Sequence, residues 1–485
     1  MTDDRMGPTG FFGRLSSVVG PRSSMSEETK ALTISERLAR FVDEISIDKL
    51  GADVIETAKL CVLDWLGSAI AGSTTRPIRI FVQVASELGG KSQATMIPNA
   101  SKTSCHLAAL VNAASSHVME MDDLHKPSVL HPAAAVIPAG LAVAERDGRS
   151  GADLLTAIVV GYEVAIRAGE ALGPSHYEFW HTTATCGVFG AATAVGKLLR
   201  LTPEQMVSAL GTAGTQSAGL WEFLVEGAMS KQLHPAMAAA DGLLAALLAQ
   251  QGFTGATRIF EGEKGLARAT SAAPNLDRLT EGLSDHPLRI LENSFKAHAA
   301  CYHIHSAIDA VLALKSAHHL DPAEIKKIHV RLYSAALDLL EKVEPTSPYA
   351  AKFSIPYCIA TALLQGRVGL DDFHEEGIRN RSVRQLMSAV DLERDAELDK
   401  AYPDRWPAIV TVETVSGKRH ETRVDYPKGD PNNPMSRDEL IEKFHTLTSR
   451  IIPETLRHLL IERCLTLNTL ANVRTLLVGL ELQSE

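Results

Sequence analysis

Apolar side chains recur at helical spacing through the first half of the chain, in long faces that end at glycine, proline or polar turns. Such faces are typical of packed helices, and Thr33 with Glu36 has the pattern of a capping box at the start of the first one. The spacing predicts helices over residues 55–71, 104–117, 132–146, 152–172, 185–199, 203–211 and 236–251. Segments 152–166 and 238–250 are apolar nearly all round, so we expect them at the centre of a large helical bundle.

The pattern changes near Leu288. Residues 325–334 alternate like a strand, and 406–427 reads as two strands joined at Ser416 and Gly417. Further helices are predicted over 351–365 and 379–390 and, after a connector rich in Gly, Pro and Asn (428–436), over 437–448, 453–464 and 471–477. A helical segment that follows a mixed segment indicates that the chain returns to its first domain.

A chain of 485 residues is too long for one compact core, so two domains are expected. We predict a mainly α fold, in which a large all-helical domain is built from both ends of the chain and a smaller α+β domain is inserted. The predicted parts are a disordered tail (1–26), the first part of the helical domain (27–287), the α+β domain (288–430) and the helical return segment (431–485). The tail lacks the long apolar stretch of a secretory signal.

The composition limits which kinds of partner the protein could bind. The aromatic content of 5% favours close-packed helices, and the net charge of −10 argues against nucleic acid as a partner, although a local pocket could still bind a small anion. No apolar run reaches the ~18–20 residues of a membrane helix, so no membrane partner is expected. The six cysteines are scattered without a C-x-x-C pair, which indicates free thiols in a reducing compartment, here the cytoplasm, and offers no ligand set for an iron–sulfur cluster.

Titratable residues are concentrated in HVMEMDDLHKPSVLHP (117–132), between two apolar helical segments. If the first helix continued through this stretch, Glu120 and Asp123 would share a face and Asp122 would point elsewhere. Lys126 precedes a proline, so we expect a polar loop there and a new helix that starts at His131. Burying so many charges is costly unless they are paired or used, which favours a functional site. The alternative is a solvated turn with incidental histidines.

The acidic loop resembles that of the MmgE/PrpD family, and further segments are similar in the same order. They are GYEVAIR (161–167), SAGLWEFLVEGAMSKQLHPAMAAADGLLAALLAQQGFTG (217–255), FEGEKG (260–265), FKAHAACYHIHSAIDA (295–310), PTSPYAAKFSIPYCIATAL (345–363) and PKGDPNNPMSRDELIEKF (427–444). The family contains 2-methylcitrate dehydratases, cis-aconitate decarboxylases and an iminodisuccinate epimerase. The resemblance implies that the inserted α+β domain is a lid, that the protein is a homodimer, and that no cofactor or metal is used.

The resemblance also implies which residues form the site. It assigns catalysis to Asp122, Asp123, His131 and His181, and substrate binding to Glu120, Lys231, His234 and Lys296. The lysines would hold carboxylates, and His131 would transfer a proton because imidazole titrates near neutral pH. For Lys231 and Lys296 the alternative is a solvated surface lysine, and for His131 it is an imidazole tied to backbone groups.

Two departures from the family bear on the substrate. Glu120 stands where the family often has Asp, and Leu337 aligns with a tyrosine of the animal decarboxylases, whose loop also has one residue fewer between Asp123 and His131. A metal site is the competing chemistry, with ligand types in the acidic loop and at His303 and His305, but the spacings match no compact zinc signature.

The leading hypothesis is a cofactor-independent lyase that acts on a small di- or tricarboxylate, most simply by dehydrating a 2-methylcitrate-like hydroxy acid. A cis-aconitate decarboxylase or a dicarboxylate epimerase would use the same acid and base groups, placed differently around the substrate. From a different class, the chain could be a non-catalytic helical scaffold that retains the fold.

Overall fold

The computed structural model describes residues 31–283, 287–341 and 344–480. The predicted disordered tail, 1–26, lies outside them. The helices before the polar loop are α1 (Ile34–Glu44), α2 (Ala52–Gly72), α3 (Arg76–Leu88) and α4 (Cys105–His117), and a hairpin of β1 (Ala94–Met96) and β2 (Ser101–Thr103) precedes α4. The capping box predicted from Thr33 and Glu36 is present at α1.

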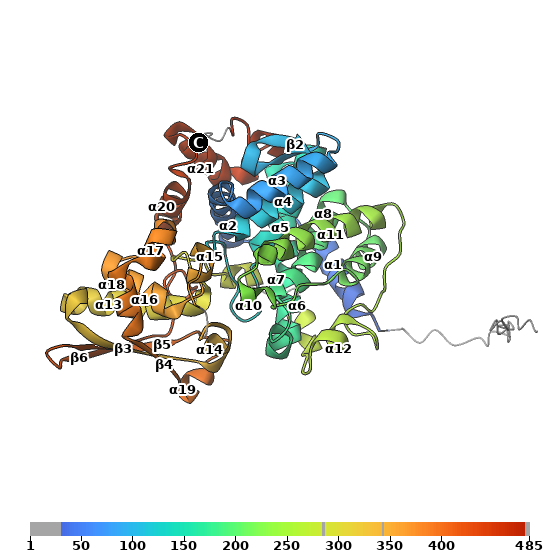
Figure 1. Cartoon of the computed structure of the whole chain (residues 1–485). Coiled ribbons are helices and arrows are strands. Elements are labelled where there is room, and N and C mark those ends of the chain that lie inside the picture. The colour runs from blue at the N-terminus through green and yellow to red at the C-terminus, as the bar shows by residue number, and fades with distance from the viewer. Residues whose placement is uncertain (1–30, 284–286, 342–343, 481–485) are drawn as a thin grey trace, which may run out of the picture. The chain divides into compact units, whose positions relative to one another are not determined.

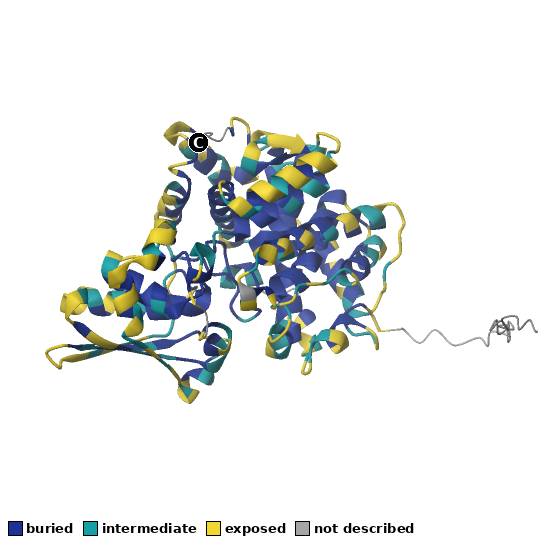
Figure 2. Ribbon diagram, viewed as in Figure 1, coloured by how far each residue is buried: buried dark blue, intermediate teal, exposed yellow. Residues whose placement is uncertain are grey.

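The helices after the loop build the centre of the bundle (Figure 1). They are α5 (Pro132–Asp147), α6 (Gly151–Tyr177), α7 (Thr182–Thr185), α8 (Gly187–Leu199), α9 (Pro203–Gly214), α10 (Phe223–Glu226), α11 (Leu233–Gln250) and α12 (Leu266–Thr270). As expected, α6 and α11 are largely buried (Figure 2). A Cβ at Gly161 would lie 2.6 Å from Val136 and 2.9 Å from the carbonyl oxygen of Gly190, so glycine lets α5, α6 and α8 approach closely.

The second half contains a four-stranded sheet in the order β4-β3-β5-β6, where β3 pairs with β4 in parallel and with β5 antiparallel. Its strands are β3 (Ile325–Leu332), β4 (Val390–Arg394), β5 (Ala408–Thr414) and β6 (Arg419–Val424), and its helices are α13 (His305–His318), α14 (Ser334–Leu340), α15 (Pro348–Ala351), α16 (Ile355–Gln365), α17 (Glu375–Arg379), α18 (Arg381–Ser388) and α19 (Ala396–Asp399). The hairpin predicted around Ser416 and Gly417 is confirmed by β5 and β6.

The chain then returns to helix in α20 (Arg437–Thr448) and α21 (Glu454–Leu465), both of which pack against α2. The mainly α fold is therefore confirmed. One hydrophobic cluster joins the N-terminal helices to α20 and α21, and a second joins β3 and β5 to α13, α14 and α16. The domain boundaries at 287/288 and 430/431 stay a prediction. No helix in the described ranges is both long and apolar enough to cross a membrane.

Two predicted helices are shorter in the structure than the sequence indicates. The predicted helix 379–390 ends as α18 at Ser388, because Val390 begins β4 and pairs with Ile328 of the neighbouring β3. The predicted helix 471–477 is only a 3-10 turn, Val473–Thr475, capped by the side chain of Asn472. Backbone pairing with distant strands and local asparagine turns compete with helical spacing at such positions.

Candidate active site

The polar loop between α4 and α5 is buried and held from several sides. The backbones of His125 and Leu130 exchange hydrogen bonds of 2.8 and 3.3 Å, and Leu124 pairs with Ser294 through two more. From α20, the Lys443 ammonium donates to the Met121 carbonyl at 2.7 Å. The loop is therefore not a solvated turn. The predicted order of helix, loop and new helix is confirmed, since α5 begins at Pro132, directly after His131.

Helix α4 ends at His117, so it does not continue through the acidic residues. Glu120 has a left-handed backbone with φ of 56°, which turns the chain out of the helix. As a result the side chains of Glu120 and Asp122 meet a common group, Lys296, whereas Asp123 contacts α5 and α6 instead. This is the opposite of the pairing that a continued helix would give.

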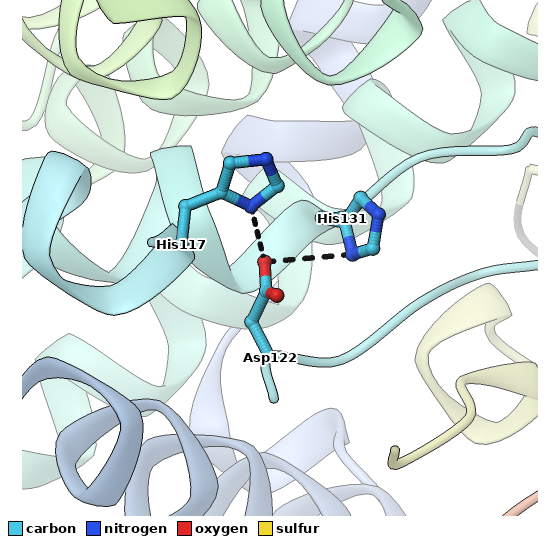
Figure 3. Close-up of side chains that lie close together, drawn as sticks. All are labelled: His117, Asp122 and His131. Atoms are coloured by element: carbon cyan, nitrogen blue, oxygen red, sulfur yellow. Dashed lines mark hydrogen bonds and ion pairs between the residues drawn. The ribbon is translucent and has the colours of Figure 1, made fainter. Parts of the chain in front are cut away.

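Asp122 lies between two imidazoles (Figure 3). Its Oδ2 is 2.6 Å from Nδ1 of His117 and 3.4 Å from Nδ1 of His131. Burial raises the pKa of Asp122, but the nearby charges of His117, His131 and Lys296 outweigh burial and keep the pKa below its ordinary value. The carboxylate is therefore ionised and can stabilise a positive charge that forms on either ring.

The imidazole of His131 is oriented by a backbone carbonyl of its own loop. Its Nδ1 lies 2.5 Å from the backbone carbonyl of Asp123, and because a carbonyl only accepts, the ring proton is on Nδ1 and Nε2 carries the lone pair. Burial, opposed by Asp122, lowers the pKa of His131 to about 3. The imidazole is thus neutral at physiological pH, with one nitrogen free to accept a proton.

The carboxyl group of Asp123 is surrounded by protein groups. Oδ1 accepts from the backbone N–H of Ala133 at 3.1 Å, and Oδ2 lies 2.8 Å from the Tyr162 hydroxyl and 2.8 Å from the Asn293 amide. Burial raises its pKa to about 8, although the hydrogen bonds from Tyr162 and Asn293 oppose this. These contacts favour a structural task for Asp123, namely joining the loop to α5 and α6.

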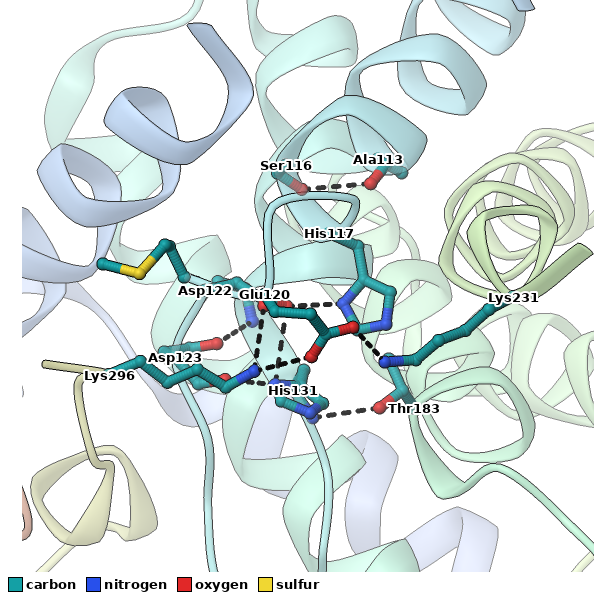
Figure 4. A network of polar contacts seen from close by, with 12 residues as sticks. Ala113, Ser116, His117, Glu120, Asp122, Asp123, His131, Thr183, Lys231 and Lys296 are labelled. Atoms are coloured by element: carbon teal, nitrogen blue, oxygen red, sulfur yellow. Dashed lines mark hydrogen bonds and ion pairs between the residues drawn. The ribbon is translucent and has the colours of Figure 1, made fainter. Parts of the chain in front are cut away.

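Glu120 bridges the two predicted lysines (Figure 4). Its Oε1 pairs with Lys231, and its Oε2 accepts from Lys296 at 2.9 Å. The Lys231 and Lys296 side chains are 3% and 1% exposed, so neither is a solvated surface lysine. Burial raises the pKa of Glu120, but Lys231 and Lys296 outweigh it and hold the pKa well below its usual range. Burial also disfavours the Lys296 ammonium, yet Glu120 and Asp122 raise its pKa overall.

His181 and His234 form a second imidazole pair beside His117, whose ring centre lies 5.6 Å from that of His181. His181 precedes α7, His234 lies in the first turn of α11, and their Nδ1 atoms are 3.1 Å apart. One Nδ1 must donate to the other, so the accepting ring carries its proton on Nε2. Burial lowers the pKa of His234 to about 4 and that of His181 well below its ordinary value. The ring centres of His181 and His131 are 6.4 Å apart.

Sequence reasoning missed three groups that lie here. His117 pairs with Asp122, the hydroxyl of Tyr349 is 3.1 Å from Oε1 of Glu120, and Lys352 donates to the Met119 carbonyl at 2.6 Å. Burial lowers the pKa of Lys352 to about 8. Tyr349 and Lys352 belong to the conspicuous segment PTSPYAAKFS, but only the fold brings that segment against the loop. The eight residues predicted for the site all lie in or beside this network, and their individual roles stay predictions.

Two groups in the described part of the chain have metal-ligand types close together. The first is His117, Asp122 and His131. The 2.6 Å contact between His117 and Asp122 is a hydrogen-bond length, shorter than the separation of two ligands on one zinc ion. The second is His125, Glu170 and Glu292, where Arg289 already lies against both glutamates, 3.4 Å from Glu170 and 2.9 Å from Glu292.

Comparisons with known proteins identify the family of this chain. The MmgE/PrpD N-terminal domain family matches residues 36–279, and the MmgE/PrpD C-terminal domain family matches residues 298–467. A cis-aconitate decarboxylase-like protein of Aspergillus oryzae is 27% identical, over 94% of this chain and 98% of its own. The human cis-aconitate decarboxylase is 28% identical, over 87% of this chain and 89% of its own. A 2-methylcitrate dehydratase of Salmonella typhimurium is 27% identical, over 31% of this chain and 34% of its own.

The chain belongs to the MmgE/PrpD family, since the two domain families together span most of its length. The relatives named above are lyases, and this chain is accordingly an enzyme of the MmgE/PrpD type.

Proposed function

We propose that the protein is a cofactor-independent lyase that removes water from a small hydroxy di- or tricarboxylate, in the manner of a 2-methylcitrate dehydratase. The observation that carries the proposal is the state of His131. It is a buried, neutral imidazole whose Nδ1–H is engaged by the Asp123 carbonyl, and whose Nε2 is therefore a base. Beside it lie Lys296, which contacts both Glu120 and Asp122, and Lys231.

In the proposed reaction Nε2 of His131 removes the proton next to a substrate carboxylate. The negative charge that develops on that carboxylate is stabilised by the ammonium groups of Lys231 and Lys296, and Asp122 stabilises the imidazolium. The carbon–carbon double bond forms as the carbon–oxygen bond breaks, the neutral His181–His234 pair donates a hydrogen bond to the departing hydroxyl group, and that group leaves as water with the proton returned from the His131 imidazolium. The α+β segment that carries Lys296 and Tyr349 would act as the lid and exclude bulk water.

Decarboxylation of cis-aconitate is the second candidate, and it is favoured by the decarboxylases that match nearly the whole chain. That reaction needs a proton delivered to carbon after carbon dioxide leaves. The buried Leu337 aligns with the tyrosine of the animal enzymes, and the Tyr333 hydroxyl is engaged by His303 at 2.6 Å, so neither supplies that proton. The tyrosine left to be considered for that proton is Tyr349, whose hydroxyl contacts Glu120.

The test is to incubate purified protein with 2-methylcitrate, citrate, cis-aconitate and iminodisuccinate, and to identify products by mass and NMR, with and without a chelator. Formation of an unsaturated acid from a hydroxy acid, unaffected by chelator and lost in His131→Gln, supports the proposal. Release of carbon dioxide from cis-aconitate would favour the second candidate, and loss of activity with chelator would contradict metal-free chemistry. No turnover of any of these four acids, or of malate as a hydroxydicarboxylate, by a folded protein would favour a scaffold.

We further propose that the enzyme is a cytoplasmic homodimer. Apolar side chains that are between 37% and 49% exposed lie on two helices that both pack against α4, namely Ile80, Val84, Leu233, Met237 and Leu244. Neighbouring exposed apolar side chains of this size are typical of a surface that another subunit covers.

A further inference from the structure

Glu120 occupies a backbone conformation that does not suit it. At φ of 56° the left-handed region is reached most easily by glycine, asparagine and aspartate, so a glutamate there is strained. Lys352 stabilises the turn by donating to the carbonyl of Met119, immediately before Glu120. Because aspartate would fit this backbone better, the useful property of glutamate is its longer reach.

That reach places one carboxylate oxygen on each of the two lysines. Oε1 pairs with Lys231 and also accepts from Tyr349 at 3.1 Å, while Oε2 accepts from Lys296 at 2.9 Å. An aspartate is one methylene shorter and could not span both ammonium groups from the same backbone position. Glu120 therefore already supplies the site with a carboxylate in the position where a substrate carboxylate would otherwise bridge the lysines.

The charges that remain set how many substrate carboxylates can be held. Lys231, Lys296 and Lys352 contribute three ammonium groups against the two carboxylates of Glu120 and Asp122, which leaves one positive charge. Each of Lys231 and Lys296 has N–H donors beyond the one that Glu120 uses, so each can still bind one carboxylate group. Lys352 likewise keeps N–H donors beyond the one that the Met119 carbonyl uses, but with one net positive charge a dicarboxylate leaves one negative charge uncompensated in the buried site and a tricarboxylate leaves two.

We propose that Glu120 is the specificity-determining residue of this site, and that it selects a small hydroxydicarboxylate over a tricarboxylate such as citrate. This inference rests on the proposed function and narrows it: 2-methylcitrate has three carboxylates, so the preferred substrate would be a hydroxydicarboxylate that is dehydrated in the same manner and held by Lys231 and Lys296.

The test compares binding of malate and citrate to the full-length protein by calorimetry, at low ionic strength. Glu120→Gln keeps the reach and removes the charge, and Glu120→Asp keeps the charge and shortens the reach. Glu413→Gln on β5 is the matched control, since Glu413 pairs with Lys326 on the sheet surface. Circular dichroism and melting curves verify that each variant is folded.

We expect wild type and Glu413→Gln to bind malate at least tenfold more tightly than citrate. Both Glu120 variants should lower that ratio by tenfold or more, because a lysine is freed for the third carboxylate. The inference is overturned if wild type binds citrate as tightly as malate, or if the ratio stays unchanged in both Glu120 variants. If neither malate nor citrate binds wild type, the proposed function fails and this inference with it; if both bind equally tightly, only this inference fails.

Discussion

The pKa of Asp123 gives a test that separates a structural carboxyl group from a catalytic one. Burial raises this pKa to about 8, so the native protein holds a proton there at neutral pH that the unfolded chain, with an ordinary pKa of about 3.9, has already released. Stability from this group is therefore complete below the unfolded pKa and is lost as pH rises through about 8. Between pH ~7 and ~9 the native state holds on average about half a proton more than the unfolded chain, and over these two pH units stability falls by about 1.4 kcal/mol.

The perturbation is Asp123→Asn. A neutral amide can accept from Ala133 as the acid does, and the Asn293 amide, whose own oxygen has no hydrogen-bond partner, can rotate to accept from the new NH₂ group. We expect the variant to be within about 1 kcal/mol of wild-type stability at neutral pH. Its stability should fall by about 1.4 kcal/mol less than that of wild type between pH ~7 and ~9.

Urea unfolding at several pH values measures the difference in stability between variant and wild type. Turnover of the identified substrate tests whether Asp123 is catalytic. The variant should keep turnover within about tenfold, whereas Asp122→Asn should lose about a hundredfold or more, because Asp122 stabilises the imidazolium of His131. The reasoning is refuted if Asp123→Asn has the wild-type pH slope, which would mean that the acid is ionised in the native state. A stable variant without turnover would instead make Asp123 catalytic, as the sequence predicted.

Three further predictions follow from the site and the surface. His131→Gln should lower kcat by about a hundredfold or more while the melting temperature stays within a few degrees, and wild-type kcat/KM should show no loss from His131 protonation until pH falls towards its pKa of about 3. Carboxylate binding should weaken as pH rises through about 8, where Lys352 loses its proton, and titration calorimetry of Lys352→Met should show weaker binding without that step. Leu233→Glu together with Met237→Glu should convert a dimer to a monomer by light scattering, whereas unchanged mass would place the subunit contact elsewhere.

Local chemistry explains which parts of the fold could be predicted. Helix α20 was predicted with its observed ends, and a capping box of Ser436 and Glu439 marks its start. The start of α5 was predicted at Pro132, because proline is favoured in the first turn of a helix. Strand β4 was missed because Val390 becomes a strand residue only through its pairing with Ile328, far away in the sequence. Helices α3 and α13 were also missed, although α3 has a clear apolar face and its spacing could have predicted it.

The site was predictable to the extent that its residues share a motif. The acidic loop, Lys231 and Lys296 could be found from residue types and the family resemblance, and the structure brings them together. The left-handed backbone at Glu120 could not be predicted, because glutamate rarely adopts it. Lys352 could not be found either, because nothing in its own sequence neighbourhood indicates that its ammonium contacts Met119, 233 residues away.

Lys443 ties the shape of the acidic loop to the end of the chain. Its ammonium bonds the carbonyl of Met121 and pairs with Asp64 of α2 at 2.6 Å, so a residue translated late clamps two segments that emerged from the ribosome early. During synthesis the loop has to wait for some 320 residues before this clamp exists. Early termination of synthesis, or proteolysis that removes α20, would thus leave every proposed catalytic residue in the chain. The product would still be unable to assemble its active site.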